Sequence, residues 1–310
     1  MTATDPIRLA IVGVGKIARD QHLPSIAGNK DIELAATVSG SGGIDGVENF
    51  GSIAELLAKR PDISAVSLCQ PPQARYEAAA EALAARRHVI LEKPPGATVS
   101  EVQALERLAA ANGVTLFATW HSRFAAAVEP ARQWLAARRV LRAVVTWKED
   151  VRRWHPGQAW IWEPGGLGVF DPGINALSIV TAILPNPVHL VSSVLDFPEN
   201  RAAPIAAELE FAGDGSTVSA TFDWRQTGPQ TWDIVIETDD GTLKLSKGGA
   251  VMSIDGVSVV VDQDREYAGI YRSFARLVRA RRSDVDLSPL VHVADAFMLG
   301  RRRIVEPFED

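Results

Sequence analysis

Several kinds of residue and segment are scarce in this chain, and each scarcity excludes a class of protein. It has one cysteine, Cys69, so no disulfide can form within the chain, and a reducing compartment is expected. Its net charge is −6, without a block of basic residues, which argues against a nucleic-acid partner. No apolar run approaches the ~18 residues of a membrane span, and no secretory signal is present. We therefore expect a soluble, cytoplasmic protein that contacts no membrane.

Patterns typical of metal sites are missing as well. His88, His189 and His292 have no spacing that suits a metal ion, so we expect no metal. What the chain does have is 310 residues, 46% of them hydrophobic. That length suffices for two domains of the usual ~100–200 residues each.

The first part of the chain alternates short apolar runs with helical patterns, which predicts a doubly wound parallel sheet. Capping boxes at Ser52–Glu55 and Ser100–Gln103 predict two helix starts, and Asn112-Gly113 predicts a helix end. The predicted strands are Leu9–Val12, Ile32–Val38, Ile63–Leu68, Val89–Leu91 and Val114–Phe117.

After residue 121 strand-like stretches follow one another, separated by glycine and aspartate turns. This predicts a C-terminal α+β domain with an open, mostly antiparallel sheet, and helices near 165–183, 266–282 and 289–304. We place the domains at 1–121 and 122–310, with the C-terminal helices able to pack back on the first. The predicted strands are Leu141–Lys148, Val188–Val194, Ala206–Phe211, Ser216–Trp224, Asp233–Glu237, Thr242–Leu245 and Val257–Val261.

The first predicted strand runs into the pattern Gly13-x-Gly15-x-x-Ala18. Gly13 permits a tight turn, Gly15 lets a pyrophosphate approach the backbone, and the following helix N-terminus, with Lys16 and Ile17, offers N–H groups. The alternative is a tight turn that binds nothing. The strand and helix on either side favour a dinucleotide site.

The end of the second predicted strand bears on the choice of cofactor. An acidic residue there would bind the ribose 2′-hydroxyl of NAD, but this chain has Ser39 and Ser41 instead. These serines could receive a 2′-phosphate, although no arginine stands beside them in the sequence. We expect NADP, with NAD also accepted.

Two further strand ends would lie at the same rim. The third strand is followed by Gln70, Pro71 and Pro72. These residues either lie beside the cofactor or form a plain turn. Glu92 and Lys93 follow the fourth, where a lysine could donate to a substrate oxygen. A cis bond to Pro94 is one way to fix the direction of the Lys93 side chain. The alternative is that Lys93 is simply a solvated charge.

Asp171 and Asn175 are four residues apart, so they share one face of a predicted helix. A carboxylate and an amide could then point together into a cleft. Alternatively, Asp171 before Pro172 is the N-cap of that helix.

These three motifs in this order resemble the glucose–fructose oxidoreductase/inositol dehydrogenase (Gfo/Idh/MocA) family. The stretches Gly15–Pro24, Gly46–Phe50 and Asp171–Leu177 resemble its aldose 1-dehydrogenase branch, the bacterial L-arabinose and D-galactose 1-dehydrogenases. Most of the broad family has histidine where this chain has Asn175. An amide cannot act as a general base, so the base would be Asp171.

The resemblance implies that His121, Glu149, Trp154 and Trp232 also line a sugar pocket. Indole rings can cover the C–H face of a sugar while polar groups bind its hydroxyls. For Trp232 a place in the core is an equal alternative, and for His22 a packing role is favoured.

The resemblance implies NAD(P)-dependent oxidation of an aldopyranose at C1 to a lactone. Asp171 would take the C1 hydroxyl proton, Lys93 would stabilise the oxyanion, and Asn175 would hold the sugar. The family also favours a homodimer. The alternatives are an inositol or other sugar dehydrogenase, an NAD-dependent glycosidase, and an NADP-binding regulator.

Overall fold

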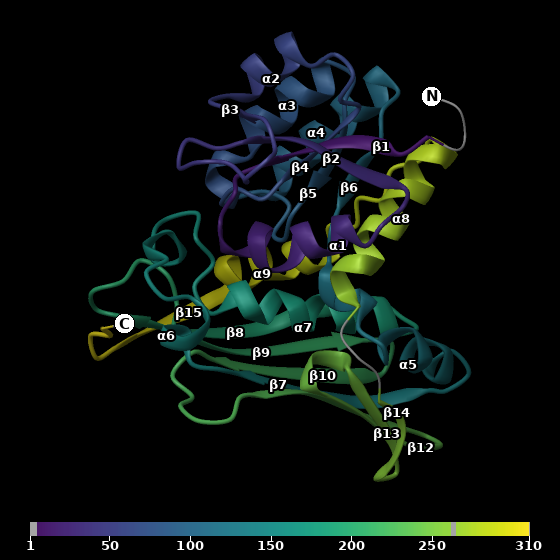
Figure 1. The fold of residues 1–310 in the computed structure, drawn as a ribbon. Helices are drawn as coiled ribbons and strands as arrows, with labels where there is room; N and C mark the ends of the chain where they lie inside the picture. Colours follow the sequence, from purple (N-terminus) through teal and green to yellow (C-terminus); the bar gives the residue numbers. More distant parts are fainter. Residues whose placement is uncertain (1–4, 262–264, 310) are drawn as a thin grey trace. The chain divides into compact units, whose positions relative to one another are not determined.

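The computed structural model describes residues 5–261 and 265–309, in which the chain divides into two compact units. The first contains the chain up to His121 together with Tyr267–Leu287. The second contains Ser122–Glu266 and the chain from Ser288 onwards. One helix from the C-terminal part of the chain therefore belongs mainly to the first unit (Figure 1).

The first unit is built on a six-stranded sheet of order β3-β2-β1-β4-β5-β6, in which every pair is parallel. Its strands are β1 (Ile7–Val12), β2 (Ile32–Val38), β3 (Asn49–Phe50), β4 (Ala65–Leu68), β5 (His88–Leu91) and β6 (Leu116–Ala118). Its helices are the π-helical η1 (Ala18–His22), α1 (Leu23–Ala27), α2 (Ile53–Lys59), the 3₁₀ turn η2 (Pro72–Ala74), α3 (Tyr76–Ala84), α4 (Val99–Asn112) and α8 (Glu266–Ala280).

The central strands of this sheet are buried on both faces, as their continuous hydrophobicity predicted. Every residue of β4 is buried, and Figure 1 shows α2 and α3 on one face and α1 on the other. The strand order reverses between β1 and β4, which is where ligands of such sheets collect. The predicted doubly wound parallel sheet is confirmed.

The helix starts of this unit were predicted with one error. Ser52 caps α2 by accepting the N–H of Glu55, as expected. The cap of α4, however, is Thr98 and not Ser100: Thr98 and Glu101 satisfy each other's backbone N–H groups. Both pairs fit the capping pattern, but the Glu101 carboxylate is a stronger acceptor than the amide of Gln103.

The second unit is built on a nine-stranded sheet of order β14-β13-β12-β11-β7-β10-β9-β8-β15. All pairs are antiparallel except β7 with β10 and β8 with β15, so the predicted mostly antiparallel sheet is confirmed. Its strands are β7 (Val140–Lys148), β8 (His189–Pro198), β9 (Ala206–Gly213), β10 (Ser216–Asp223), β11 (Thr231–Thr238), β12 (Gly241–Ser246), β13 (Val251–Ile254), β14 (Val257–Val261) and β15 (Gly300–Val305).

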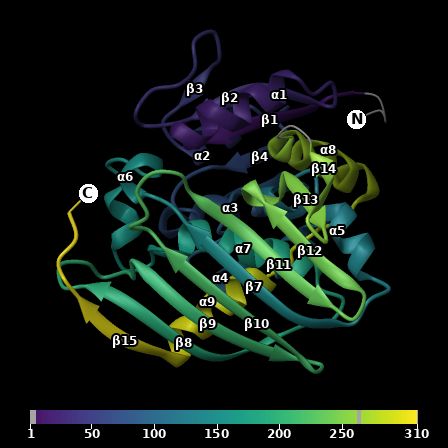
Figure 2. The same ribbon diagram turned by 90° about the horizontal axis from the view of Figure 1, so that it is seen from below.

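Helices cover one face of this sheet, as Figure 2 shows for α7 and α9. The strands alternate accordingly: in β9, Leu209 and Phe211 are buried while Glu208 and Glu210 are exposed. The helical segments of this unit are η3 (His121–Phe124, at the boundary), α5 (Val128–Leu135), α6 (Val151–Trp154), η4 (Ala159–Trp162), α7 (Phe170–Ile183), η5 (Lys247–Gly249) and α9 (Ser288–Leu299).

The end of the chain differs from the prediction of one helix over 289–304. Helix α9 stops at Leu299, and 300–305 form β15 beside β8. A Cβ at Gly300 would lie 2.6 Å from the carbonyl oxygen of Ala296, so the backbone turns tightly there. Arg303 then forms an ion pair with buried Asp196, at 2.5 Å. This contact comes from a distant strand, which the local pattern could not reveal.

Candidate functional site

The two glycines of the turn after β1, Gly13 and Gly15, have different roles. Gly13 has a φ of +89°, and a Cβ there would lie 2.9 Å from the backbone nitrogen of Gln70. Gly13 is therefore required by the fold itself. Gly15 is exposed, and a Cβ on it would meet nothing within 4 Å, so the space beside it is open to a ligand. Lys16 and Ile17, which follow it, are also exposed.

The loop after β2 contains the two serines predicted to receive a phosphate. Ser39 Oγ lies 3.1 Å from Ser41 Oγ, and Ser41 donates its N–H to Ser39. The Arg19 guanidinium donates to the Gly43 carbonyl of the same loop, at 3.1 Å. Sequence reasoning missed Arg19 because it precedes the loop by a whole strand, and the pairing of β1 with β2 brings it back.

The turn after β4 offers an unsatisfied polar atom. Gln70 Oε1 is buried and has no hydrogen-bond partner among the described residues. Pro71 and Pro72 then lead into η2. An open glycine turn together with an unsatisfied acceptor fits a dinucleotide lying across these strand ends. The predicted cofactor residues all follow β1, β2, β4 or β5 at this edge of the sheet: Gly13, Gly15, Lys16, Ile17, Ser39, Gln70, Pro71, Pro72, Glu92 and Lys93.

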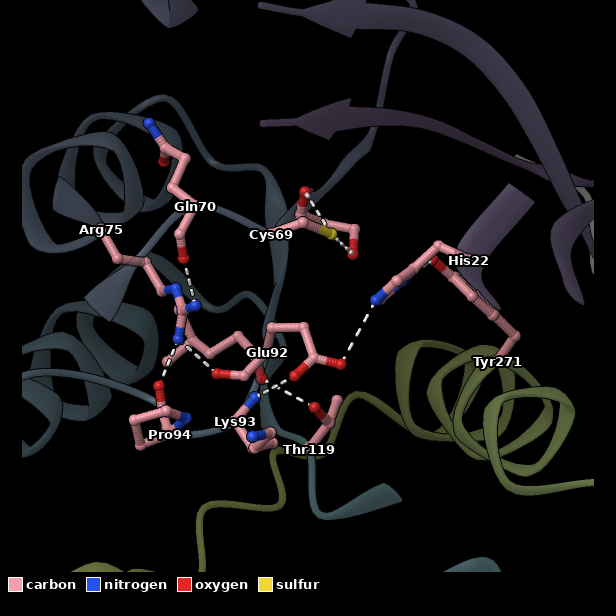
Figure 3. A network of polar contacts seen from close by, with 11 residues as sticks. His22, Cys69, Gln70, Arg75, Glu92, Lys93, Pro94, Thr119 and Tyr271 are labelled. Carbon is pink, nitrogen blue, oxygen red and sulfur yellow. Dashed lines mark hydrogen bonds and ion pairs between the residues drawn. The ribbon is translucent and has the colours of Figure 1, made fainter. Parts of the chain in front are cut away.

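Lys93 follows β5 and is half-buried. The Lys93–Pro94 peptide bond is cis. The backbone N–H of Lys93 donates to the carboxylate of Glu92, and Thr119 donates its hydroxyl to the carbonyl of Leu91 (Figure 3). His121 stacks on Tyr267 with ring centroids 5.3 Å apart.

The Glu92 side chain is paired inside the first unit (Figure 3). Its Oε1 lies 3.3 Å from His22 Nε2, and His22 Nδ1 lies 2.7 Å from the Tyr271 hydroxyl. All three side chains are buried. His22 is therefore a polar link between η1, β5 and α8, a role that the sequence did not indicate.

Burial by itself opposes charge on both members of this pair. The hydrogen bond and positive charge of His22 nevertheless lower the pKa of Glu92 from 4.5 to about 2. In the same way, burial would lower the pKa of His22, but Cys69, Tyr271 and Glu92 beside it raise that pKa well above 6.5. Glu92 is therefore an anion and His22 a cation at neutral pH.

In the second unit a buried carboxylate, Glu149, is bound by two indoles. Its Oε2 accepts the N–H of Trp232 at 2.9 Å, and its Oε1 accepts that of Trp224 at 3.3 Å. Glu149 directly follows β7, Trp224 follows the parallel strand β10, and Trp232 lies on the other neighbour, β11. The sheet order therefore gathers the three side chains.

Asp171 belongs to the same cluster, through a residue that sequence reasoning did not name. His155 Nε2 lies 3.5 Å from Asp171 Oδ2 and 3.8 Å from Glu149 Oε1. Trp154, which was named, instead packs against Trp232 with ring centroids 5.4 Å apart. Sequence reasoning named Trp154 and not the next residue, His155. Helix α6 ends at Trp154, and His155 then lies near the two carboxylates.

The N-cap alternative for Asp171 is wrong. Helix α7 begins at Phe170 with Val169 as its cap, so Asp171 lies inside the first turn. Its side chain is buried, and Asn175 follows one turn later, half-buried. The predicted substrate residues are thus divided between the units: Lys93 and His121 belong to the first, and Glu149, Trp154, Asp171, Asn175 and Trp232 to the second.

Known proteins resemble this chain in sequence and in structure. Residues 7–119 match the model of the Gfo/Idh/MocA oxidoreductase family with an NAD-binding Rossmann fold. The chain is 46% identical to a galactose 1-dehydrogenase of Pseudomonas fluorescens over 318 residues, covering 98% of this chain and 99% of the relative. The chain belongs to the Gfo/Idh/MocA oxidoreductase family.

Two solved structures show how far the likeness extends. The crystal structure of a D-galactose-1-dehydrogenase from Rhizobium etli is 59% identical, covers 100% of both chains and has a TM-score of 0.96. The 3-ketoreductase KijD10 of Actinomadura kijaniata, solved with NADP and TDP-benzene, is 18% identical with a TM-score of 0.83. It covers 97% of this chain and 99% of its own, and shares the fold alone.

Residues 5–261 and 265–309 contain no group of three or more His, Cys, Asp or Glu side chains that could hold a metal ion. Nor is any helix within those ranges long and apolar enough to cross a membrane.

The two glycines of the β1 turn should respond differently to alanine. Gly13→Ala should lower the free energy of unfolding by about 1–3 kcal/mol, because its positive φ and the contact with Gln70 both penalise a Cβ. Gly15→Ala, the matched control for folding, should leave that free energy within about 1 kcal/mol of wild type and weaken dinucleotide binding. Urea unfolding and fluorescence titration with NADPH measure the two effects. Equal stability losses in both variants would contradict this division.

Glu92→Gln should destabilise the protein by about 3–5 kcal/mol near neutral pH, because it leaves the His22 cation buried without its partner. The stabilisation from Glu92 is present above pH 4.5 and is lost as pH falls toward about 2. The stabilisation from His22 is present below pH 6.5 and is lost as pH rises through its raised pKa. The difference in the free energy of unfolding between Glu92→Gln and wild type should therefore be largest between pH 4.5 and pH 6.5.

Urea-unfolding midpoints across the pH range measure that difference. The control is Glu55→Gln, which breaks an exposed pair with Lys59 and should leave the unfolding midpoint close to that of wild type at every pH. A difference between wild type and Glu92→Gln that does not vary with pH would refute the buried ion pair.

Proposed function

We propose that this protein oxidises an aldopyranose, D-galactose and/or L-arabinose, at C1 to the aldonolactone. The observation that carries the proposal is the cluster of buried Asp171 and Glu149 with half-buried His155, beside indole rings. It supplies a base and a polar pocket suited to a sugar. The likeness over the whole chain to two galactose 1-dehydrogenases supports this choice of substrate.

Each residue has a role in this proposal. Bound NADP supplies the hydride acceptor. Asp171 takes the proton of the C1 hydroxyl, and His155, 3.5 Å from its Oδ2, orients that carboxylate. Lys93 stabilises the negative charge that develops on the C1 oxygen. Asn175, one turn along α7 from Asp171, holds the sugar so that its C1 hydroxyl faces the base.

The same cluster suits the remainder of the sugar. Two indole N–H groups anchor Glu149, and a carboxylate keeps capacity to accept sugar hydroxyls as well. Trp154 and Trp232 offer flat faces for the sugar C–H groups, and we also propose His121 as a partner for a sugar hydroxyl. Galactose and arabinose differ by the exocyclic carbon, and a single apolar group discriminates only modestly. Activity on both sugars is therefore expected.

For the cofactor we propose NADP, with NAD also used. The loop after β2 lacks a carboxylate at the ribose position and carries Ser39 and Ser41 there. Arg19, hydrogen-bonded to the same loop, provides the cation that the serines lack. An arginine with hydroxyl groups is a strong receptor for a phosphate group.

We further propose a cytoplasmic homodimer formed through the sheet of the second unit. The face of that sheet opposite the buried core carries half-buried Val144, Val235 and Ser219 on adjacent strands. Static light scattering at micromolar concentration should give twice the mass of the 33.4 kDa chain. A monomeric mass would end the dimer proposal.

Initial rates of absorbance change at 340 nm, with aldoses and inositols and with each dinucleotide, test the activity. We expect reduction of NADP with galactose or arabinose. Lys93→Ala and Asp171→Ala should each lower kcat by about 100-fold or more while still binding NADPH. Arg132→Ala, at an exposed ion pair on α5, is the control and should keep wild-type rates.

Other outcomes distinguish the alternatives. Faster reduction with an inositol would place the protein with other dehydrogenases of the family. Release of sugar from a glycoside without net change at 340 nm would indicate a glycosidase. Tight NADPH binding without any turnover would indicate a regulator. Wild-type kcat in Lys93→Ala would remove Lys93 from the mechanism.

Arg19→Ala should raise the KM for NADP about tenfold or more while changing that for NAD by less than about threefold, because the lost contact is charge-assisted. Steady-state kinetics with both dinucleotides measures the two effects. Arg19→Lys keeps a positive charge and should recover part of the NADP affinity. Equal effects on NADP and NAD would show that Arg19 merely shapes the loop.

A further inference from the structure

Arg75 is a buried cation in the turn between β4 and α3, with only 2% of its surface exposed. Its guanidinium donates hydrogen bonds to three backbone carbonyls, those of Gln70, Glu92 and Pro94 (Figure 3). Gln70 lies in the turn after β4, and the other two lie in the turn after β5. One side chain therefore joins two neighbouring turns at the carboxyl edge of the sheet.

The two carbonyls after β5 are those on either side of Lys93 in the chain. The ladder between β4 and β5 ends at the pair Leu68–Leu91, so Lys93 lies beyond the strand pairing. Its own N–H is held by the Glu92 carboxylate. The backbone around the lysine is thus fixed by a buried anion on one side and the Arg75 guanidinium on the other.

We propose that Arg75 is a positioning residue: it holds the backbone at Lys93 in the geometry that the reaction requires. This inference rests on the proposed function, in which Lys93 acts on the sugar C1 oxygen. Arg75 acts on the reaction through the backbone of Lys93, and its hydrogen bond to the Gln70 carbonyl anchors the guanidinium. It is not itself a catalytic residue.

The chemistry of the guanidinium explains why arginine stands at this position. Its five N–H donors lie in one plane and can reach several fixed acceptors together, whereas a lysine ammonium is a compact point charge on a flexible stem. A misplacement of about 1 Å at a reacting group can cost about 100-fold in rate. The hydrogen bonds of Arg75 on both sides of Lys93 should therefore affect the turnover rate far more than sugar binding.

The experiment compares Arg75→Met and Arg75→Lys with the same changes at Arg60. Arg60 also binds a backbone carbonyl, that of Ala35, in the first unit, but it precedes β4 at the opposite end of that strand. Arg75→Met should lower kcat by about 10- to 100-fold with less than a threefold change in the KM for the aldose. Arg75→Lys should lie between this and wild type. The Arg60 variants should keep wild-type kcat.

A double-mutant cycle separates positioning from a general structural effect. If Arg75 acts through Lys93, Arg75→Met should reduce kcat by less than about threefold in a Lys93→Ala background. The same large factor in both backgrounds would overturn the proposal, as would unchanged kcat in Arg75→Met. Should the Met variant fail to fold, the cycle is run with Arg75→Lys.

Hydrogen–deuterium exchange gives a readout that does not depend on turnover. Peptides covering residues 66–76 and 88–97 should both exchange faster in the Arg75 variants than in wild type, and should not change in the Arg60 variants. If wild type oxidises no aldose but both peptides respond, the proposed function fails and the tie between the turns stands. If neither peptide responds, the tie itself is wrong.

Discussion

Charge buried behind the carboxyl edge of the parallel sheet is the constraint on which the first unit depends. The Glu92 carboxylate lies between His22 and the backbone of Lys93, and Arg75 donates hydrogen bonds to the carbonyls on both sides of that lysine. Buried ions are tolerated only when they are paired and hydrogen-bonded. His22 and Glu92 therefore hold each other, and Arg75 holds the backbone of the turn after β5.

The second unit meets the same requirement with different partners. Glu149 is surrounded by indoles that satisfy its oxygens through their N–H groups, while His155 stands between Glu149 and Asp171. The carboxylates retain the capacity to accept hydroxyl groups. Carboxylates beside indole rings are the combination that a sugar with one C–H face requires.

The two units divide the chemistry in the function that we propose. The first, with Gly15 open beside its turn and Gln70 unsatisfied, suits the dinucleotide and presents Lys93. The second supplies the base and the sugar contacts. Cofactor chemistry needs little from the protein beyond placement and charge stabilisation.

The sequence by itself determined the fold class, because hydrophobic periodicity and glycine turns are local signals that tertiary packing left unchanged. It also placed Lys93 at a strand end and Asp171 with Asn175 on one helix face, since both follow from spacing along a single element. Only the tertiary structure showed the contacts of Arg19, Arg75 and His155. Their partners lie on other elements, and strand order, which local patterns do not encode, brings them together.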